Sequence, residues 1–249
     1  MSTIVEHRTA GDRARLTGGA RAVRVGQIED GARSGVRDML PVAVAVAPFA
    51  MVLGIAIDAS VVPDAVGALM APLIYAGSAN FAAVSVLDVG GPIVTAVATA
   101  LIVNVRFTMY GAALAARFRE QPGWFRWLGP WMIVDQTFAI AAARGATEPG
   151  WFRGYWMAAG TVLGGVYTMM VCAGIVLGPV VPADVGLDFT IPALFVAMLV
   201  GHLRDRPAAV AALVGGLVTA LALELPHGLG LPVGAVAGAL AGAVTRRSS

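Results

Sequence analysis

Residues 154–178 read GYWMAAGTVLGGVYTMMVCAGIVLG, a run of 25 residues without Asp, Glu, Lys, Arg or His. A helix of about 20 apolar residues is long enough to cross the hydrocarbon core of a bilayer. Within the run, Gly160 and Gly164, and likewise Gly174 and Gly178, are four residues apart, a spacing that lets another helix approach closely. The run therefore predicts a transmembrane helix that packs tightly against a neighbour.

The rest of the chain has the same apolar character. Of its 249 residues 58% are hydrophobic and 13% are charged, and the mean hydropathy is +0.79. This composition lies far outside that of soluble globular proteins and excludes a sizeable soluble catalytic domain. We expect an all-α, polytopic membrane helical bundle with about seven or eight transmembrane segments, some of them broken or re-entrant. The hydrophobic windows lie at roughly 40–57, 65–87, 92–115, 127–143, 154–178, 189–203, 207–223 and 231–245.

The distribution of charge predicts the domain organisation and the orientation. Residues 1–38 hold seven arginines and five acids but no apolar core, so we expect a cytoplasmic N-terminal tail rather than a signal peptide. Residues 39–245 form the expected transmembrane permease domain, and residues 246–249 a short cytoplasmic C-terminal tail. With eight crossings, the positive-inside rule places both arginine-containing ends in the cytoplasm.

One loop conflicts with this topology. Eight crossings would place Arg117, Arg119 and Arg126 outside the cell, against the positive-inside rule. Either this loop is an exception, or a flanking segment does not span the membrane fully. The second and fourth windows are the suspects, because Pro72 interrupts the former and the latter is short and contains Asp135.

Several classes of function find no support in the sequence. The net charge of +2 is a balance between a few loops, so no nucleic-acid partner is expected. Cys172 is the single cysteine, and no Cys/His spacing indicates a metal site or a cofactor. Ser78 lies beside Gly77, as a nucleophile in a glycine-flanked turn does, but no membrane-embedded histidine is available as its base. We therefore expect a protein that is not an enzyme.

Two fully ionisable residues lie within the expected spans, away from their ends: Arg106 and Asp135. A charged side chain at the centre of a membrane helix costs about 2.5–3.5 kcal/mol on insertion scales, so such residues usually face the bundle interior and serve a function. The Arg106 guanidinium could bind a substrate carboxylate through two parallel hydrogen bonds. Alternatively, Arg106 and Asp135 form a structural ion pair that never meets a ligand.

The third window carries a polar stripe. Thr95, Thr99, Arg106 and Tyr110 are separated by steps of 4, 7 and 4 residues, which would place them on one face of a continuous helix. This spacing predicts one polar face on that helix, with Tyr110 presenting its hydroxyl beside Arg106.

The second window changes from apolar to small and polar residues in mid-membrane, at Tyr75-Ala-Gly77-Ser78-Ala-Asn80-Phe81. Such a stretch is typical of a broken helix, whose free backbone groups, with Gly77, Ser78 and Asn80, could bind a small zwitterion. The alternative is a packing surface of small residues. In the fourth window, Asp135, Gln136 and Thr137 offer a carboxylate for proton coupling, with amide and hydroxyl neighbours.

Regularly spaced glycines also run along the last hydrophobic window. Gly230, Gly234, Gly238 and Gly242 recur at four-residue steps and form a smooth ridge. This ridge favours packing inside the bundle, and a second subunit seated on the last helix is the alternative. The sequence shows no convincing internal repeat.

Three of these motifs resemble those of one family. Tyr75-Ala-Gly-Ser-Ala-Asn80-Phe81 is similar to its Tyr-Ala-Gly-Ala/Ser-Ser/Ala-Gln-Phe motif. Asn104-Val-Arg106-Phe107-Thr-Met-Tyr110-Gly111 is similar to its Asp/Asn-x-Arg-His-x-x-Tyr-Gly motif, and Asp135-Gln136-Thr-Phe138 to its Asp-Glu-x-Phe motif. The chain thus resembles the AzlC family, the large subunits of branched-chain amino acid exporters, from about Gly31 to Leu240.

The resemblance implies a multi-pass permease of the bacterial inner membrane that exports leucine, isoleucine, valine and often methionine. It implies a small membrane subunit of the AzlD family as partner, and coupling to the proton gradient. Three residues depart from the family pattern: Phe107 replaces the usual His, Gln136 the usual Glu, and Asn80 the usual Gln. Two titratable groups are lost, which favours Asp135 as the proton carrier.

Two alternatives remain open. A proton-linked permease for another small solute would share every feature except the pocket. A non-transporting membrane scaffold subunit would need neither Arg106 nor Asp135 for its role.

Overall fold

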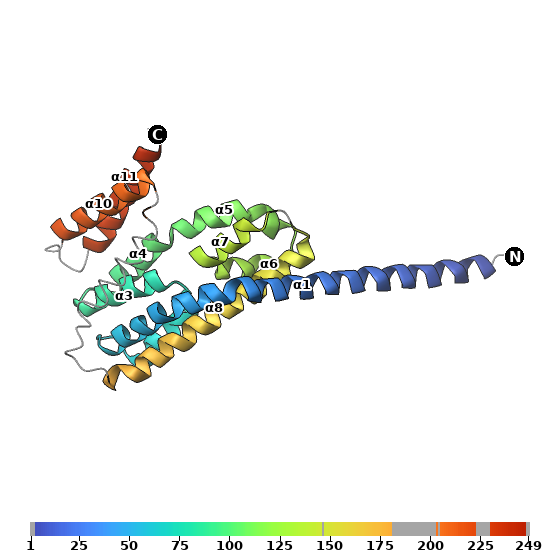
Figure 1. Cartoon of the computed structure of the whole chain (residues 1–249), viewed down its shortest axis with the longest axis horizontal. Helices are drawn as coiled ribbons and strands as arrows, with labels where there is room; N and C mark the ends of the chain where they lie inside the picture. Colours follow the sequence, from blue (N-terminus) through green and yellow to red (C-terminus); the bar gives the residue numbers. More distant parts are fainter. Residues whose placement is uncertain (1–2, 146, 181–202, 204, 223–229, 248–249) are drawn as a thin grey trace. The chain divides into compact units, whose positions relative to one another are not determined.

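The computed structural model describes residues 3–145, 147–180, 203, 205–222 and 230–247, and all regular structure in them is helical (Figure 1). The sixth window, 189–203, lies almost wholly outside these residues. The helices are α1 (Thr3–Asp58), α2 (Asp64–Ile74), α3 (Gly77–Asp88), α4 (Ile93–Asn104), α5 (Arg106–Arg119), α6 (Gly123–Leu128), the 3-10 helix η1 (Gly129–Met132), α7 (Asp135–Ala143), α8 (Pro149–Leu177), η2 (Gly178–Val180), α10 (Arg206–Leu221) and α11 (Gly230–Arg247). The expected all-α fold is confirmed.

Among the described residues, two helical stretches are long and apolar enough to cross a membrane, Val25–Asp58 and Pro149–Val180. The pair α4 and α5, bent by 44° at its break, meets the same test as a unit. The number of crossings, about seven or eight by segment length, stays a prediction. The 34 residues of Val25–Asp58 extend over about 51 Å, well beyond a hydrocarbon core of about 30 Å, so this helix must continue outside the membrane.

The chain divides into two units, each described here by itself. Unit 1 comprises residues 1–44 and 110–163, and unit 2 comprises residues 45–109 and 164–249. Helices α1 and α8 contribute to both units. The core of unit 2 includes Phe49, Leu53 and Ile57 of α1 packed with Tyr167 and Val171 of α8.

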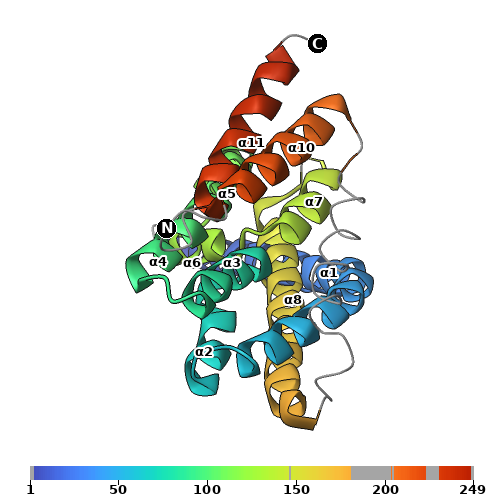
Figure 2. The ribbon, with the colours of Figure 1, turned by 90° about the vertical axis from the view of Figure 1, so that its left-hand side faces the viewer.

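Helices α1 and α8 lie side by side and run parallel (Figures 1 and 2). In unit 1 a Cβ on Gly31 or Gly35 would collide with the carbonyl oxygen of Trp151 or Tyr155, respectively. In unit 2 a Cβ on Gly54 would lie 2.8 Å from the Cα of Gly174. Each contact joins residues about 120 apart in sequence, so the register is constant along both helices. The small residues are what allow the two backbones to approach this closely.

The sequence that follows each of these two helices repeats at nearly the same spacing. Val61-Val62-Pro63, with Gly67 four residues later, recurs as Val180-Val181-Pro182 with Gly186. This recurrence is short, and it stands out only once the parallel register of α1 and α8 is known.

The second and fourth windows are broken, as the sequence predicts. Between α2 and α3, Tyr75 adopts a left-handed conformation (φ 52°) and Ala76 is extended. Between η1 and α7, Ile133 and Val134 are extended. Breaks of this kind free backbone groups in an apolar environment, so other groups must satisfy them. The Trp156 indole donates 2.8 Å to the Gly129 carbonyl, and the Thr137 hydroxyl donates 2.7 Å to the Met132 carbonyl.

The prediction of one polar stripe on a continuous third helix is wrong. The helix breaks at Val105 and bends by 44°, so Thr95 and Thr99 lie on α4, whereas Arg106 begins α5. Thr99 is buried and donates its hydroxyl 2.8 Å to the Thr95 carbonyl on its own helix. The Thr99 hydroxyl is therefore occupied within its own helix.

The arginine-rich loop lies beside the N-terminal part of α8. Arg117 donates 2.8 Å to the Ala141 carbonyl, and the Gln121 amide donates 3.0 Å to the Pro149 carbonyl. Pro149 opens α8, whose first turns pack against residues 28–35 of α1. The loop therefore lies at the same end of unit 1 as the arginine-containing part of α1. This favours the second of the two explanations above, that a flanking segment does not span fully.

The glycine ridge packs inside the chain, which supports the first of its two interpretations. In unit 2, α10 and α11 form a hairpin whose helices lie side by side (Figures 1 and 2). A Cβ on Gly238 would lie 3.0 Å from the Cα of Gly215, and one on Gly242 would lie 2.9 Å from the Cβ of Ala211.

Candidate functional site

All three sequence motifs occur at the start of a helix that follows a break. Gly77 and Ser78 open α3, Arg106 opens α5, and Asp135 opens α7. The first turn of a helix presents unsatisfied backbone N–H groups and the positive end of the helix dipole. Broken helices of this kind form the substrate sites of many membrane transporters.

In unit 2 the first and second motifs meet. The Arg106 guanidinium donates a hydrogen bond of 2.8 Å from Nη2 to Oγ of Ser78, and both side chains are half-buried. Arg106 also lies over the Phe107 ring, with 5.4 Å from its guanidinium carbon to the ring centroid. The sequence predicts that Arg106 and Ser78 bind the substrate together. The structure brings the two side chains into contact, and their role in binding stays a prediction.

Gly77 is required by close packing. A Cβ at this position would collide with the ring of Phe49, which in turn packs on Phe81 with 5.4 Å between ring centroids. The start of α3 therefore has an aromatic neighbour on one side and the Arg106 guanidinium at Ser78.

Asn80 has a partner that sequence reasoning missed. Its side-chain amide nitrogen donates 2.8 Å to the hydroxyl of Tyr167 on α8, and only 1% of Asn80 is exposed. Its Oδ1 has no hydrogen-bond partner among the described residues. Tyr167 is 87 residues away within a long apolar run, so no local pattern distinguishes it from a core residue.

In unit 1 the third motif meets Tyr110. The Tyr110 hydroxyl donates 2.8 Å to Oδ1 of Asp135, and its ring stacks on Phe138 at 4.3 Å between centroids and 9° between planes. Thr137 accepts 3.0 Å from the Val134 N–H and so caps the start of α7. Gln136 is half-buried on the same turn. The Tyr110 hydroxyl, expected to serve a ligand, is directed to Asp135.

The structure thus groups the predicted residues in two sets. Gly77, Ser78, Asn80 and Arg106 belong to unit 2, and Tyr110, Asp135 and Gln136 to unit 1. The ion pair between Arg106 and Asp135 would join two units that are described separately, so it stays a prediction.

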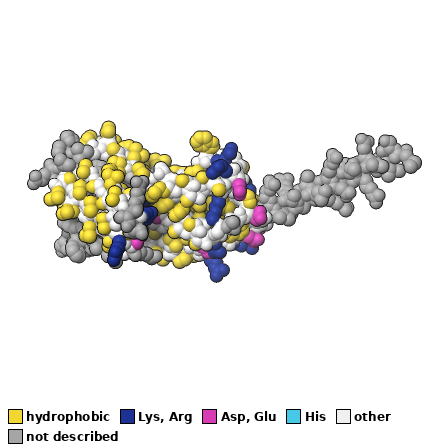
Figure 3. All heavy atoms as spheres, turned by 90° about the horizontal axis from the view of Figure 1, so that it is seen from above, with side chains coloured by type: hydrophobic (Ala, Val, Ile, Leu, Met, Phe, Trp, Pro, Cys, Tyr) yellow, Lys and Arg dark blue, Asp and Glu magenta, His cyan; other side chains and the backbone are white. Residues whose placement is uncertain are grey.

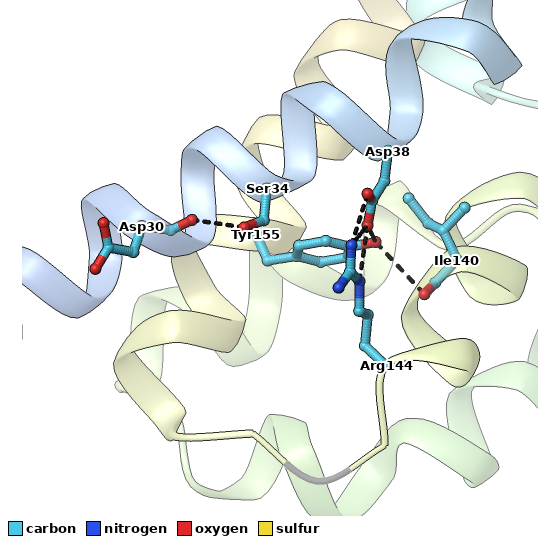
Figure 4. Close-up of polar contacts among 6 residues, drawn as sticks. All are labelled: Asp30, Ser34, Asp38, Ile140, Arg144 and Tyr155. Carbon is cyan, nitrogen blue, oxygen red and sulfur yellow. Dashed lines mark hydrogen bonds and ion pairs between the residues drawn. The ribbon is translucent and has the colours of Figure 1, made fainter.

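A further polar cluster in unit 1 has no counterpart among the predicted site residues. Arg144 donates to both carboxylate oxygens of Asp38, from Nε at 2.8 Å and from Nη2 at 2.6 Å, and the Tyr155 hydroxyl donates 2.8 Å to the same carboxylate (Figure 4). The hydrogen bond to Asp38 raises the pKa of the Arg144 guanidinium above its already high value. The cluster ties the end of α7 to α1 and α8, and it leaves the Asp38 charge compensated.

Within the described residues, no group of three or more His, Cys, Asp and Glu side chains could hold a metal ion. The polar groups around Ser78 and Asp135 are hydroxyl, amide, guanidinium and single carboxylate groups.

Comparison with known proteins agrees with the resemblance. Residues 41–181 match the family model of the AzlC protein. The inner membrane protein YgaZ of Escherichia coli K12 is 26% identical over 203 residues, which cover 77% of this chain and 82% of that protein. No solved structure matches the chain. The apolar helices, the inner-membrane relative and the family match support a membrane transport component. The chain belongs to the AzlC protein family.

Proposed function

We propose that this chain is a permease that exports branched-chain amino acids, and methionine with them, across the bacterial inner membrane. The observation that carries the proposal is the hydrogen bond from Arg106 to Ser78 at the broken start of α3. A guanidinium beside the free N–H groups of a helix N-terminus is a site for a carboxylate. A carboxylate is common to all amino acid substrates.

The apolar surroundings support an aliphatic side chain on the substrate. Phe49 and Phe81 pack beside Gly77 in the same unit as Arg106. Small-molecule sites typically combine an apolar lining with a few convergent polar groups. Leucine, isoleucine, valine and methionine match such a lining better than polar amino acids do.

Asp135 supplies the group for proton coupling. As a carboxylate it only accepts hydrogen bonds, and it accepts one from Tyr110. Protonation would make it a donor and would change its bond to Tyr110. This bond connects the start of α7 to α5. A proton on Asp135 would therefore change the contact between these two helices. A small AzlD-type membrane subunit completes the proposed transporter.

The test is efflux of leucine, isoleucine, valine and methionine from bacteria loaded with the matching dipeptides. The chain is expressed with and without the small subunit, as wild type and as Arg106→Lys. Lysine keeps the charge but cannot form two parallel hydrogen bonds with a carboxylate, so we expect efflux to fall at least about tenfold, equivalent to about 1.4 kcal/mol.

Arg119→Lys is the matched control, because Arg119 is exposed at the end of the same helix, α5. Normal efflux by Arg106→Lys, at equal protein level, would exclude bidentate capture of the substrate carboxylate. Efflux of none of the four amino acids with both subunits present would direct the search to another small solute, consistent with the departures at Phe107, Gln136 and Asn80.

A further inference from the structure

We propose that unit 1 binds one anionic phospholipid in a groove between α1, α6 and α8. The groove has a volume of about 690 Å³, within the range of small-molecule sites. Its lining is almost entirely apolar, and Arg153 is the charged residue in it. None of the predicted transport-site residues lines the groove, so the proposal stands independently of the proposed function.

The groove is polar at one end and apolar at the other. Because α1 and α8 are parallel with a constant offset of about 120 residues, Arg153 lies level with Arg33 on α1. Val162, at the other end of the α8 lining, lies level with residue 42, within the first hydrophobic window, 40–57. A headgroup phosphate at Arg153 would therefore place its acyl chain along Met157 and Val162, toward the hydrocarbon core.

Tryptophans mark this part of unit 1 as the membrane–water interface. All five tryptophans of the chain lie between residues 124 and 156. Trp124, Trp127 and Trp131 on α6 and η1 are 52%, 86% and 47% exposed. Tryptophan is enriched at the headgroup level of membrane proteins. Trp124 also lines the groove, so the groove opens at headgroup depth.

The charge on α1 beside the groove is mixed, because Glu29 and Asp30 are exposed within one turn of Arg33. The charge that favours an anion is that of Arg153 in the lining itself. Figure 3 shows arginine and acidic side chains intermixed where the charged side chains are most numerous, and hydrophobic side chains over much of the rest of this face. Arg33 and Arg37 are exposed on α1 near the level of Arg153. Asp38, five residues beyond Arg33, is already paired with Arg144 and so repels an incoming phosphate little. Basic pockets between helices at this depth are typical binding sites for anionic headgroups.

The floor of the groove is shaped for an extended chain. Ala32 and Ala158 are small, and Gly154 has no side chain because a Cβ there would collide with the Ile28 carbonyl. The close approach of α1 and α8 thus leaves a shallow, open and mostly apolar groove above their contact. A protein helix packed in this groove would cover the half-buried Arg153 side chain and remove its charge from water without replacing that interaction. A lipid phosphate would pair with the charge and so offset the cost of desolvation.

The test uses the purified full chain in vesicles in which either phosphatidylglycerol or phosphatidylcholine carries brominated acyl chains, which quench nearby tryptophans. We expect stronger quenching by brominated phosphatidylglycerol, and a preference that falls about fivefold in Arg153→Gln, the effect of one interfacial charge of about 1 kcal/mol. Arg119→Gln, an exposed arginine of the same unit outside the groove, should keep the preference. Inorganic phosphate alone should not compete.

A second variant, Ala158→Phe, fills the groove without changing charge. It should reduce quenching by both lipids while the protein keeps its melting temperature. Equal preference in Arg153→Gln and wild type, or equal loss in Arg153→Gln and Arg119→Gln, would overturn the proposal. So would an Ala158→Phe protein that keeps its lipid preference but loses self-association or its small subunit, because the groove would then belong to a protein partner.

Discussion

At the scale of single residues, the polar side chains of this protein are directed to one another over long sequence distances. Arg106 reaches Ser78, Asn80 reaches Tyr167, and Arg144 reaches Asp38. The bond to Tyr167 spares the buried Asn80 amide nitrogen the cost of having no partner, and Arg106 and Ser78 gain the same benefit to a smaller degree because they are half-buried. Arg144 and Asp38 are more exposed. The side chains that are most unusual for a membrane segment are thus also those that connect its helices.

The bond between Asn80 and Tyr167 provides a prediction at this scale. Tyr167→Phe removes the hydroxyl and leaves the buried Asn80 amide without that partner, which costs about 1–3 kcal/mol of stability. The melting temperature of the purified protein in detergent should fall accordingly. In a Tyr167→Phe background, Asn80→Ala should cost less than it does alone, as in a double-mutant cycle. Fully additive effects would show that the two side chains do not interact.

At the scale of elements, the contact of α1 with α8 depends on glycines that have no room for a methyl group. A Cβ on Gly174 would lie 2.9 Å from the Cα of Gly54, whereas a Cβ on Gly165 of the same helix would meet nothing within 4 Å. An alanine at Gly165 therefore changes only helix propensity, whereas an alanine at Gly174 also disturbs the packing of α8 against α1.

This contrast predicts that a glycine-to-alanine substitution has opposite effects on stability at the two positions. Gly165→Ala should be neutral or stabilise the protein by up to about 1 kcal/mol, since alanine favours a helix. Gly174→Ala should destabilise it by about 1–3 kcal/mol, because a backbone must shift. Thermal unfolding of both variants in detergent measures the difference. Similar stability changes would mean that α1 and α8 do not approach as closely as described.

At the scale of the whole molecule, the position of the arginine-rich loop determines how the chain is threaded through the membrane. Gln121 binds the Pro149 carbonyl at the start of α8, and α8 begins beside residues 28–35 of α1. The arginines of this loop and those of α1 thus lie at the same end of unit 1, in agreement with the positive-inside rule.

Because the loop and the arginines of α1 lie at the same end of unit 1, we expect both to be accessible from the same side of the membrane. In a Cys172→Ser background, single cysteines at Arg33 and Arg119, both exposed, should react with a membrane-impermeant maleimide from the same side of the membrane. Labelling after detergent lysis controls for cysteines that cannot react at all. Reaction from opposite sides would restore the eight-crossing topology, in which the loop is an exception.

Local sequence patterns predict the elements better than they predict the contacts. Pro72 and the small residues after it indicate the break before α3, and the chain does break there. The break at Val105 was not predicted, because no proline or glycine marks it and the spacing of Thr95, Thr99, Arg106 and Tyr110 fits one continuous helix. The clusters around Tyr167 and Asp38 were missed because Tyr167 is 87 residues from Asn80, Asp38 is 106 or more residues from its partners, and neither cluster belongs to one motif.

By itself, the sequence determined that this protein is a helical membrane protein of the AzlC family, and it identified Arg106 and Asp135 as its unusual charges. Those conclusions depend on composition and local motifs. A segment can cross the membrane if it has enough consecutive apolar residues and if its backbone N–H and C=O groups form hydrogen bonds within it, and both conditions are set by the segment's own sequence. Only the tertiary structure decided that Arg106 meets Ser78, that Tyr110 meets Asp135, and that α1 and α8 run parallel. These contacts arise from side-chain shape and close packing between distant segments, and hydrophobic periodicity carries no information about such pairing.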